Sequence, residues 1–580
     1  MVTARWRRVA SGIGLIPWPQ PFGYPLGVSG RDSLRASTLV WLALVLVVSL
    51  LLRAPGIGLP LERDEGEYAY VAQHWLAGEP PYMETFSQKP PGITATYALA
   101  FALGGETPSA ARWAAAIATA ATLLILFALV RRLISEPAGL VAAAFCGLLC
   151  ADPAFLGNAA NTELFMLPLL TASLLASLRA AGARSVAWSA VAGALGGAAL
   201  LFKQPAAPNL LLAALLATAG GGIAGAGRRM LAFGLGAAAA VAPVPIYFAA
   251  VGALRGLWDS VVGYNLNYAT VVRLDQYAEA IRLSFPRSLR PFTALYLLAV
   301  IGVVTASVRV ARGTAAPAVR RSAAVLLAWL AASVLGVSVG GYFREHYYLQ
   351  AAPPLAALAA LGASEVVVPL LALRRREPVL VALVILVIGL AVLATPAYYL
   401  SSSPESRSLF VYHENPFLES PVVASFIAGR TSPEESVFIF GSEPQILFLA
   451  KRRAASRYLC VYPLMLPTAD ARRRQQEALA EIRRAAPAMI VTTTVGTSFL
   501  RSAQSPYDLF LGLRAMLRRD YRLVARVPEE TRGALEAVSP EAAERAWTAD
   551  PGLGNPQVWG RLAVWERVRA DVSTGEGTSP

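Results

Sequence analysis

The sequence predicts a polytopic α-helical membrane protein with about eleven transmembrane helices and a small soluble C-terminal α/β domain. Of its 580 residues, 56% are hydrophobic and 15% are charged, whereas soluble domains carry about 25% charged residues. Apolar runs long enough to cross a bilayer recur between about residues 38 and 400, and charges recur every few residues thereafter. We therefore expect a cytoplasmic N-terminal segment (1–37), a transmembrane domain (38–400), an extracytoplasmic domain (401–570) and a disordered tail (571–580).

The positive charge of the chain indicates membrane orientation and not nucleic-acid binding. The formal net charge is +14, but the arginines gather in short clusters between apolar runs, such as Arg131–Arg132, Arg228–Arg229 and Arg320–Arg321. Basic loops of this kind stay on the cytoplasmic side, and no segment resembles a nucleic-acid-binding module. We therefore expect a multi-pass protein of the cell (plasma) membrane with its N-terminus in the cytoplasm.

Apolar length places the spans, and the alternation of basic loops sets their direction. The first span has no evident signal-peptide cleavage site, so we expect it to be retained. Residues 91–104 are apolar but short and flanked by proline and glycine, which favours a juxtamembrane or re-entrant segment. The expected spans cover approximately residues 38–53, 110–130, 138–151, 163–178, 186–202, 207–225, 230–250, 291–308, 322–340, 347–365 and 378–398.

The C-terminal region alternates strand-like and helix-like stretches. Ser436–Phe440 and Ala488–Thr492 are short apolar runs typical of buried strands, and Tyr521–Val527 and Leu562–Arg567 predict further strands. Residues 468–486, rich in Arg, Ala and Glu, have the periodicity of an amphipathic helix. This mixture predicts a small α/β domain.

The three cysteines imply neither a disulfide framework nor a zinc site. Cys146 and Cys150 are four residues apart on one face of an apolar run, and Cys460 is isolated in the C-terminal region. Without neighbouring histidines, packing is their expected role.

The first outer loop, residues 54–109, holds the most informative stretch of the sequence. Glu62–Tyr70 contains four carboxylates within six residues, and residues 65–78 have the spacing of a helix lying at the membrane interface. Pro80-Pro81 and then Gln88-Lys89-Pro90-Pro91-Gly92 follow. A solvated acidic loop is the plain alternative, but an acidic cluster and a lysine on one proline-constrained loop favour a functional site.

These motifs resemble the C-type glycosyltransferases (GT-C), in particular the family-39-like branch of protein O-mannosyltransferases and lipid A aminoarabinose transferases. The first outer loop carries Asp64-Glu65 after the first span, followed by Lys89-Pro90-Pro91. Each motif alone is weak, but their order, spacing and sidedness are specific over about residues 50–460. The further motifs are Asn161-Thr162-Glu163 after Asp152, Phe202-Lys203-Gln204-Pro205, Tyr342 to Leu349 followed by Pro353-Pro354, Phe440 to Pro444, and Ser456-Arg457-Tyr458.

The resemblance implies an inverting glycosyltransferase that uses a polyprenyl-phosphate-linked sugar on the extracytoplasmic membrane face. The phosphate of such a donor is a good leaving group that needs positive charge and not a proton donor. The acceptor hydroxyl is a poor nucleophile and needs a general base. The resemblance puts Asp64 in that role and leaves Glu65 as a structural or acceptor-orienting partner, with an exchange of the two roles as the alternative.

Cations on the same side of the membrane are the candidate phosphate ligands. Lys89, Arg344 and His346 come first, because lysine and the arginine fork suit phosphate, although an isolated histidine is more often a packing residue. Lys203, at the outer end of a span, either binds the anionic donor or snorkels to the interface.

Further substrate-binding candidates lie at outer span ends. Asp152 and Glu163 are carboxylates at the membrane boundary, where such groups are functional suspects. Tyr342 either contacts substrate or belongs to an interfacial aromatic belt.

We expect no cofactor and no metal. The chain has no Asp-x-Asp motif, with which nucleotide-sugar enzymes hold a metal, and lysine and arginine can neutralise a phosphate instead. The two acidic loops, if they face each other, leave a divalent ion as the alternative.

Two other classes of protein share parts of this pattern. A transporter or flippase for lipid-linked sugars also has many spans, but such proteins often contain internal repeats, and none is evident in this sequence. A membrane assembly protein does not need the acidic pair and the lysine. The sequence leaves open whether the donor sugar is mannose, arabinose, aminoarabinose or galactose, and whether the acceptor is a lipid, a glycan or a protein.

Overall fold

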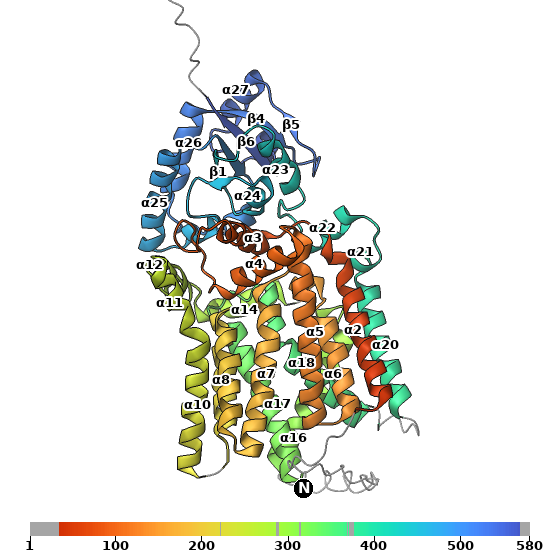
Figure 1. Ribbon diagram of the computed structural model, residues 1–580. Helices are drawn as coiled ribbons and strands as arrows, with labels where there is room; N and C mark the ends of the chain where they lie inside the picture. The colour runs from red at the N-terminus through yellow and green to blue at the C-terminus, as the bar shows by residue number, and fades with distance from the viewer. Residues whose placement is uncertain are drawn as a thin grey trace, which may run out of the picture.

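A computed structural model describes residues 34–220, 222–285, 289–312, 315–367, 369 and 376–568. A bundle of apolar helices forms one part of the molecule, and a domain with a mixed β-sheet covers one end of the bundle (Figure 1). The predicted fold class is therefore confirmed. The segment 571–580, predicted to be disordered, and almost all of the predicted N-terminal segment lie outside the described residues.

Each predicted span coincides with a helix or a pair of helices. Within the described residues, seven helical segments are long and apolar enough to cross a membrane: α2 (Ala36–Ile57), α5 (Pro108–Leu133), α7 (Thr162–Ala183), α10 with α11 (Ile223–Val241 and Pro243–Ala250), α16 (Thr293–Arg312), α17 (Pro317–Ser338) and α20 (Arg376–Ala394). Four shorter helices pack among them: α6 (Glu136–Leu149), α8 (Val186–Leu200), α9 (Ala207–Thr218) and α18 (Ala352–Gly362).

Local sequence explains where these helices begin and how closely they pack. The hydroxyls of Thr107, Ser135 and Ser185 cap the first turns of α5, α6 and α8, as hydroxyl side chains do at helix N-termini. Helices α8 and α10 approach closely at Gly193, where an added Cβ would overlap the carbonyl oxygen of Phe233. Small residues permit such backbone contact inside membranes.

The end of the bundle next to the sheet domain carries short elements that build the site. Helix α3 (Arg63–Leu76) and helix α4 (Gly92–Gly104) lie between the bundle and the C-terminal domain (Figure 1). At 13 residues, α4 is too short to count as a span. The remaining short elements at this end are η1 (Pro153–Phe155), η2 (Gln204–Ala206), α12 (Leu254–Leu257), η3 (Trp258–Gly263), α13 (Tyr264–Tyr268), η4 (Leu274–Gln276), α14 (Tyr277–Ser284), η5 (Glu345–Ala351), α21 (Pro396–Tyr399) and α22 (Pro404–Tyr412). The short element η6 (Ala363–Val367) follows α18 at the opposite end, where Glu365 pairs with Arg309 of α16.

The C-terminal domain is built on a six-stranded sheet of order β2-β1-β3-β6-β4-β5. The strands β1, β2 and β3 are parallel, and β6 pairs antiparallel with both β3 and β4. Their bounds are β1 (Ser436–Phe440), β2 (Arg453–Ala454), β3 (Met489–Thr493), β4 (Tyr521–Val527), β5 (Glu536–Ala537) and β6 (Leu562–Arg567). The four strands predicted from the sequence are thus present. The mixture of parallel and antiparallel pairing could not be predicted from the sequence of any one strand.

Alternate residues of the strands enter two different cores. Val437 and Ile439 point to the side covered by α23 (Ser420–Ala428) and α24 (Gln445–Ala450), in a core that continues into α3 and the bundle. Phe438 and Phe440 point to the opposite core, which is covered by α25 (Ala469–Ala485), α26 (Asp508–Asp520) and α27 (Pro540–Ala549). Short elements η7 (Tyr462–Met465), η8 (Gly496–Ser498) and α28 (Pro556–Trp559) complete the domain. Because one core crosses the boundary, the C-terminal domain is firmly seated on α3.

Candidate active site

The four carboxylates of the first outer loop have different surroundings. Glu62 caps α3 and accepts hydrogen bonds from the amides of Asp64 (3.0 Å) and Glu65 (3.1 Å). Glu67 is buried and accepts a 2.6 Å hydrogen bond from the Ser87 hydroxyl. Burial, followed by the charge of Asp64, raises the pKa of Glu62 to about 8 and of Glu67 to about 7. These two groups therefore hold protons near neutral pH more readily than ordinary glutamates.

Glu65 is held by a buried arginine. Arg112 of α5 donates to both carboxylate oxygens, at 2.9 and 2.6 Å, and both side chains are fully buried. The amide of Ala160 donates to the same carboxylate at 2.8 Å. Of the two interpretations of Glu65 left open by the sequence, the geometry favours the structural one, because the carboxylate is enclosed by α5 and the α6–α7 turn.

Asp64 is the carboxylate that faces cations. Its Oδ2 lies 3.6 Å from Lys89 Nζ and 3.9 Å from His346 Nε2, and it accepts a 3.4 Å hydrogen bond from the Tyr68 hydroxyl. The Asp64 side chain remains 15% exposed, whereas that of Lys89 is 8% exposed. The predicted base and the first predicted phosphate ligand are therefore adjacent and still reachable from outside.

A second buried ion pair lies next to the first. Lys203 donates to Glu163, which also accepts a 2.9 Å hydrogen bond from the Thr162 hydroxyl. Lys203 Nζ also sits 3.3 Å from the centroid of the Tyr347 ring, an arrangement that stabilises a cation. This lysine is 6% exposed, so it is locked in protein and does not snorkel to the interface.

His346 joins the two ion pairs. Burial lowers the pKa of His346 to about 4; the positive charges of Lys203 and Lys89 act in the same direction, and the carboxylates of Glu163 and Asp64 oppose it. The imidazole is therefore neutral at physiological pH. Its Nδ1 atom is buried and has no hydrogen-bond partner within the described part of the chain.

Neighbouring cations set the ionisation of Asp64. Burial opposes ionisation of this carboxyl, but the charges of Lys89 and then of His346 and Lys203 outweigh it, so the pKa of Asp64 lies below its ordinary value of 3.8. Burial likewise opposes the charge of Lys89, but Asp64 more than compensates and raises the pKa of Lys89 above its usual value. Both groups are charged at neutral pH.

Arg344 and Tyr342 line an adjoining cavity of about 490 Å³, between residues 272–284 and the 341–345 loop. The Tyr342 ring stacks on Tyr268 with centroids 4.0 Å apart, and the guanidinium of Arg344 lies 6.0 Å from the same ring. Arg344 precedes His346 by two residues, so the cavity adjoins the Asp64 cluster without being part of it.

Asp152 lies outside the cluster. Its Oδ1 accepts a 2.8 Å hydrogen bond from the amide of Ala154 in the α6–α7 turn, and the neighbouring Ala151 carbonyl accepts one from the Tyr399 hydroxyl. The residue is fully buried. A substrate contact is not favoured by this position, because the side chain organises the turn that follows α6.

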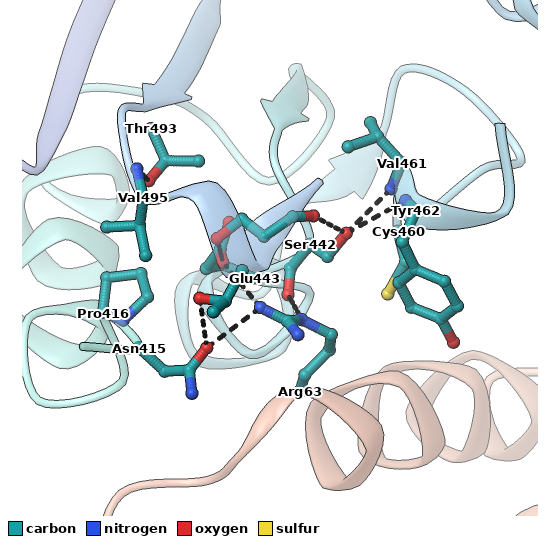
Figure 2. Close-up of polar contacts among 12 residues, drawn as sticks. Arg63, Asn415, Pro416, Ser442, Glu443, Cys460, Val461, Tyr462, Thr493 and Val495 are labelled. Carbon is teal, nitrogen blue, oxygen red and sulfur yellow. Dashed lines mark hydrogen bonds and ion pairs between the residues drawn. The ribbon is translucent and has the colours of Figure 1, made fainter. Parts of the chain in front are cut away.

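The C-terminal domain anchors α3 through Arg63, a contact that sequence reasoning missed. Arg63 donates to the Ser442 carbonyl at 2.7 Å and to Asn415 Oδ1 at 3.3 Å, and it lies 3.5 Å from the buried Glu443 carboxylate (Figure 2). Gly66 permits the close approach, since a Cβ there would meet the amide nitrogen of Gln445 at 2.6 Å. The first turn of α3, which carries Asp64, is thus fixed from the domain that follows the spans.

Removing the Arg63 anchor should slow catalysis more than it weakens substrate binding. We expect Arg63→Met to lower the free energy of unfolding by about 1–3 kcal/mol, because Glu443 loses its charged partner. We expect kcat to fall about tenfold or more, because Asp64 is displaced. Thermal unfolding and steady-state kinetics in detergent measure both. Arg518→Met, on the exposed surface of α26, is the control, and an unchanged kcat in Arg63→Met would contradict the anchoring role.

No group of three or more His, Cys, Asp or Glu side chains among the described residues could hold a metal ion. The two acidic loops do lie close together, but Asp64 and Glu163 each already face a lysine. The expectation that no metal is needed stays a prediction.

Comparison with solved structures places the fold among the C-type glycosyltransferases. ArnT from Cupriavidus metallidurans bound to undecaprenyl phosphate matches with a TM-score of 0.54 and 18% identity, covering 79% of this chain and 94% of that one. ArnT in the apo state gives the same TM-score and coverage at 16% identity. The apo oligosaccharyltransferase of Archaeoglobus fulgidus matches with a TM-score of 0.50 and 14% identity, over 86% of this chain and 74% of that one.

A family comparison points in the same direction. Residues 88–247 match the family described as dolichyl-phosphate-mannose-protein mannosyltransferase. The matched region includes Lys89, Glu163 and Lys203, while Asp64 and His346 lie outside it. A search of curated protein sequences gave no match. The resemblance to C-type glycosyltransferases indicated by the motifs is therefore confirmed.

Proposed function

We propose that this protein is an inverting glycosyltransferase that moves a sugar from a polyprenyl-phosphate donor to an acceptor hydroxyl. The observation that carries the proposal is the ionised Asp64 carboxylate beside Lys89, with Lys203 and His346 next to them. A base and a phosphate-binding cation, placed together where apolar helices meet a soluble domain, suit a lipid-linked donor and a hydroxyl acceptor.

The proposed reaction is a single displacement at the anomeric carbon. Asp64 takes the proton of the acceptor hydroxyl as the acceptor oxygen bonds to C1 of the sugar. The bond between C1 and the phosphate oxygen breaks, and its electron pair leaves with polyprenyl phosphate. Lys89 stabilises the negative charge that gathers on this phosphate, and neutral His346 donates one hydrogen bond to a phosphate oxygen.

The names of the relatives support the class of donor. ArnT has been seen with undecaprenyl phosphate, and the matching family is described by its use of dolichyl-phosphate mannose. Both compounds are phosphates of a long isoprenoid, and in dolichyl-phosphate mannose the phosphate also carries a sugar. A buried pair of lysines at the membrane boundary of this chain suits the same phosphate group.

We place the site on the extracytoplasmic side of the membrane. Helix α5 begins beside Glu65 and ends with Arg131 and Arg132, while α7 begins with Glu163 and ends near Arg179 and Arg184. The basic residues therefore lie at the end of the bundle remote from the site. The positive-inside rule puts that end in the cytoplasm, and the C-terminal domain on the outer face.

An assay with purified protein in detergent distinguishes a glycosyltransferase from a transporter. Radiolabelled polyprenyl-phosphate-linked mannose, galactose, arabinose and aminoarabinose are offered in turn, and transfer or slow hydrolysis of sugar is measured. Because detergent leaves no compartments, a flippase cannot produce free or transferred sugar. We expect turnover of one donor, and a large loss of donor affinity in Lys89→Met. Specific donor binding without turnover of any donor would instead support the transporter.

The pH profile should report the charge around Asp64. A general base acts only when ionised, and the pKa of Asp64 in the free protein lies below 3.8. The acidic limb of kcat/KM, which reflects the free enzyme, should therefore lie below pH 4. The bound phosphate offsets the lysine charges, so the limb of kcat should lie at higher pH. If the acidic limbs of kcat/KM and kcat lay at the same pH, the proposed electrostatic coupling between the bound phosphate and Asp64 would be contradicted.

A further inference from the structure

A set of uncharged polar side chains adjoins the Asp64–Lys89 pair. Gln88 precedes Lys89, is 8% exposed, and donates from Nε2 to the Tyr462 hydroxyl at 2.9 Å. Its backbone carbonyl accepts a 2.7 Å hydrogen bond from the Asn265 side chain. The Gln88 side chain thus connects the first outer loop with the C-terminal domain.

Tyr462 reaches this place from the C-terminal domain. The Ser442 hydroxyl accepts hydrogen bonds from the amides of Val461 (3.1 Å) and Tyr462 (3.2 Å), which fixes the turn that presents the ring (Figure 2). Burial, followed by the charges of Asp64 and Glu67, raises the pKa of Tyr462 well above its usual value. The phenol therefore lies near the proposed base and stays protonated.

Tyr264 forms the third side of the set. Its ring is 1% exposed and packs edge-on against Phe86, with centroids 5.2 Å apart, and stacks on Tyr268 at 5.7 Å. The adjacent residue is Asn265, which is bonded to Gln88. Tyr264 therefore lies on a segment of the membrane domain that packs against residues 86–88 of the first outer loop.

Two polar atoms of this set are unsatisfied. Gln88 Oε1 and the Tyr264 hydroxyl are buried and have no hydrogen-bond partner among the residues that the structure describes. A buried polar atom without a partner is destabilising, and most such atoms find one. An amide oxygen and a phenol can accept from and donate to hydroxyl groups. The aromatic rings beside them provide the apolar surface typical of ligand sites.

We propose that Gln88, Tyr264 and Tyr462 bind the sugar ring of the donor and select an uncharged sugar. This proposal rests on the proposed function, because it places the ring beside the phosphate held at Lys89. None of the three side chains is charged at neutral pH. The Glu67 carboxylate, whose charge acts on Tyr462, already accepts from the Ser87 hydroxyl and contacts Cys460, so an ammonium group on the sugar would find no free counter-ion among these residues.

Binding of two ligands that differ only in the sugar tests the subsite. Wild-type protein, Gln88→Met, Tyr264→Phe and Tyr462→Phe are titrated with polyprenyl phosphate and with polyprenyl-phosphate-linked mannose, arabinose and aminoarabinose. We expect the wild type to bind an uncharged sugar donor more tightly than the bare carrier. Each variant should weaken that donor about 3- to 10-fold and change the affinity for polyprenyl phosphate less than twofold.

Two controls separate the subsite from the proposed function. Lys89→Met should weaken both ligands, and its failure to do so would count against the phosphate site itself. Tyr507→Phe, which alters a tyrosine 40% exposed on the C-terminal domain, should change neither. Equal losses for both ligands in the Gln88 and tyrosine variants, no loss in any of them, a wild type that gains nothing from the sugar, or a preference for aminoarabinose would overturn the proposal. Thermal unfolding of each variant shows that the fold is retained.

Discussion

We expect Asp64→Asn to lower kcat by about 10²- to 10⁴-fold, the contribution typical of a general base. Asparagine keeps the shape of the side chain but cannot take the acceptor proton. Donor affinity should remain or rise, because the anionic phosphate no longer meets a carboxylate beside Lys89. Single-turnover transfer of radiolabelled sugar measures the loss, and titration of the donor measures affinity.

The neighbouring carboxylates provide matched controls for Asp64. Glu67→Gln changes a buried carboxyl three residues further along α3, which contacts Ser87 and Cys460, and should lower kcat less than tenfold. Glu544→Gln, on the exposed surface of α27, should lower it less than twofold. A larger loss in Glu67→Gln than in Asp64→Asn would move the base to Glu67, whose pKa of about 7 also suits proton transfer.

The fold was largely predictable because membrane spans impose strong sequence patterns. A helix in lipid must satisfy its own backbone and present apolar side chains for about 20 residues, so apolar length located the helices from α2 to α20. Four of these helices are shorter than a full membrane span, and they pack against the longer helices around them. The strands β1, β3, β4 and β6 were also predictable, since β1 and β3 are short apolar runs and β4 and β6 have strand-like sequences, but their order depends on pairing between distant segments.

The residues that gather at the candidate site could be named from the sequence, but the contacts that distinguish one carboxylate from another could not. Asp64 and Lys89 lie on the first outer loop, whereas Glu163, Lys203 and His346 lie at or next to the ends of three different spans. They meet because all these segments are at the same end of the bundle. Which of four neighbouring carboxylates faces the lysines depends on partners far along the chain. Sequence spacing also gave no reason to separate Arg344 and Tyr342, which line the adjoining cavity, from His346.

The contribution of the C-terminal domain was the main omission. Arg63 is one residue from Asp64, yet its partners Asn415, Ser442 and Glu443 follow some 350 residues later. Nothing in the local pattern indicates that contact. Arg112 is different, because an arginine near the start of an apolar span is rare and is functional or paired by default. That signal was present in the sequence and would have led to Glu65.

Breaking the Glu65–Arg112 pair should have the largest effect on stability. Both side chains are fully buried, and Arg112 also donates to the carbonyls of Gly56 (2.9 Å) and Pro60 (2.9 Å) at the end of α2. We expect Arg112→Met to lower the free energy of unfolding by about 3–5 kcal/mol, because Glu65 is left as an unpaired buried charge. Thermal unfolding in detergent measures the loss.

Two further variants test whether the loss of stability comes from the buried Glu65–Arg112 pair or would follow from any arginine substitution in α5. Arg131→Met, at the other end of the same helix, breaks a partly exposed pair with Glu136 and should cost at most about 1 kcal/mol. Arg112→Lys keeps the charge but not the planar fork, so its stability should lie between Arg112→Met and the wild type. Because Glu65 also holds the Ala160 amide, loss of the pair loosens the turn that precedes Glu163. Arg112→Lys should therefore lower kcat even where it stays folded, and an unaltered kcat would show that this pair stabilises the bundle without positioning the site.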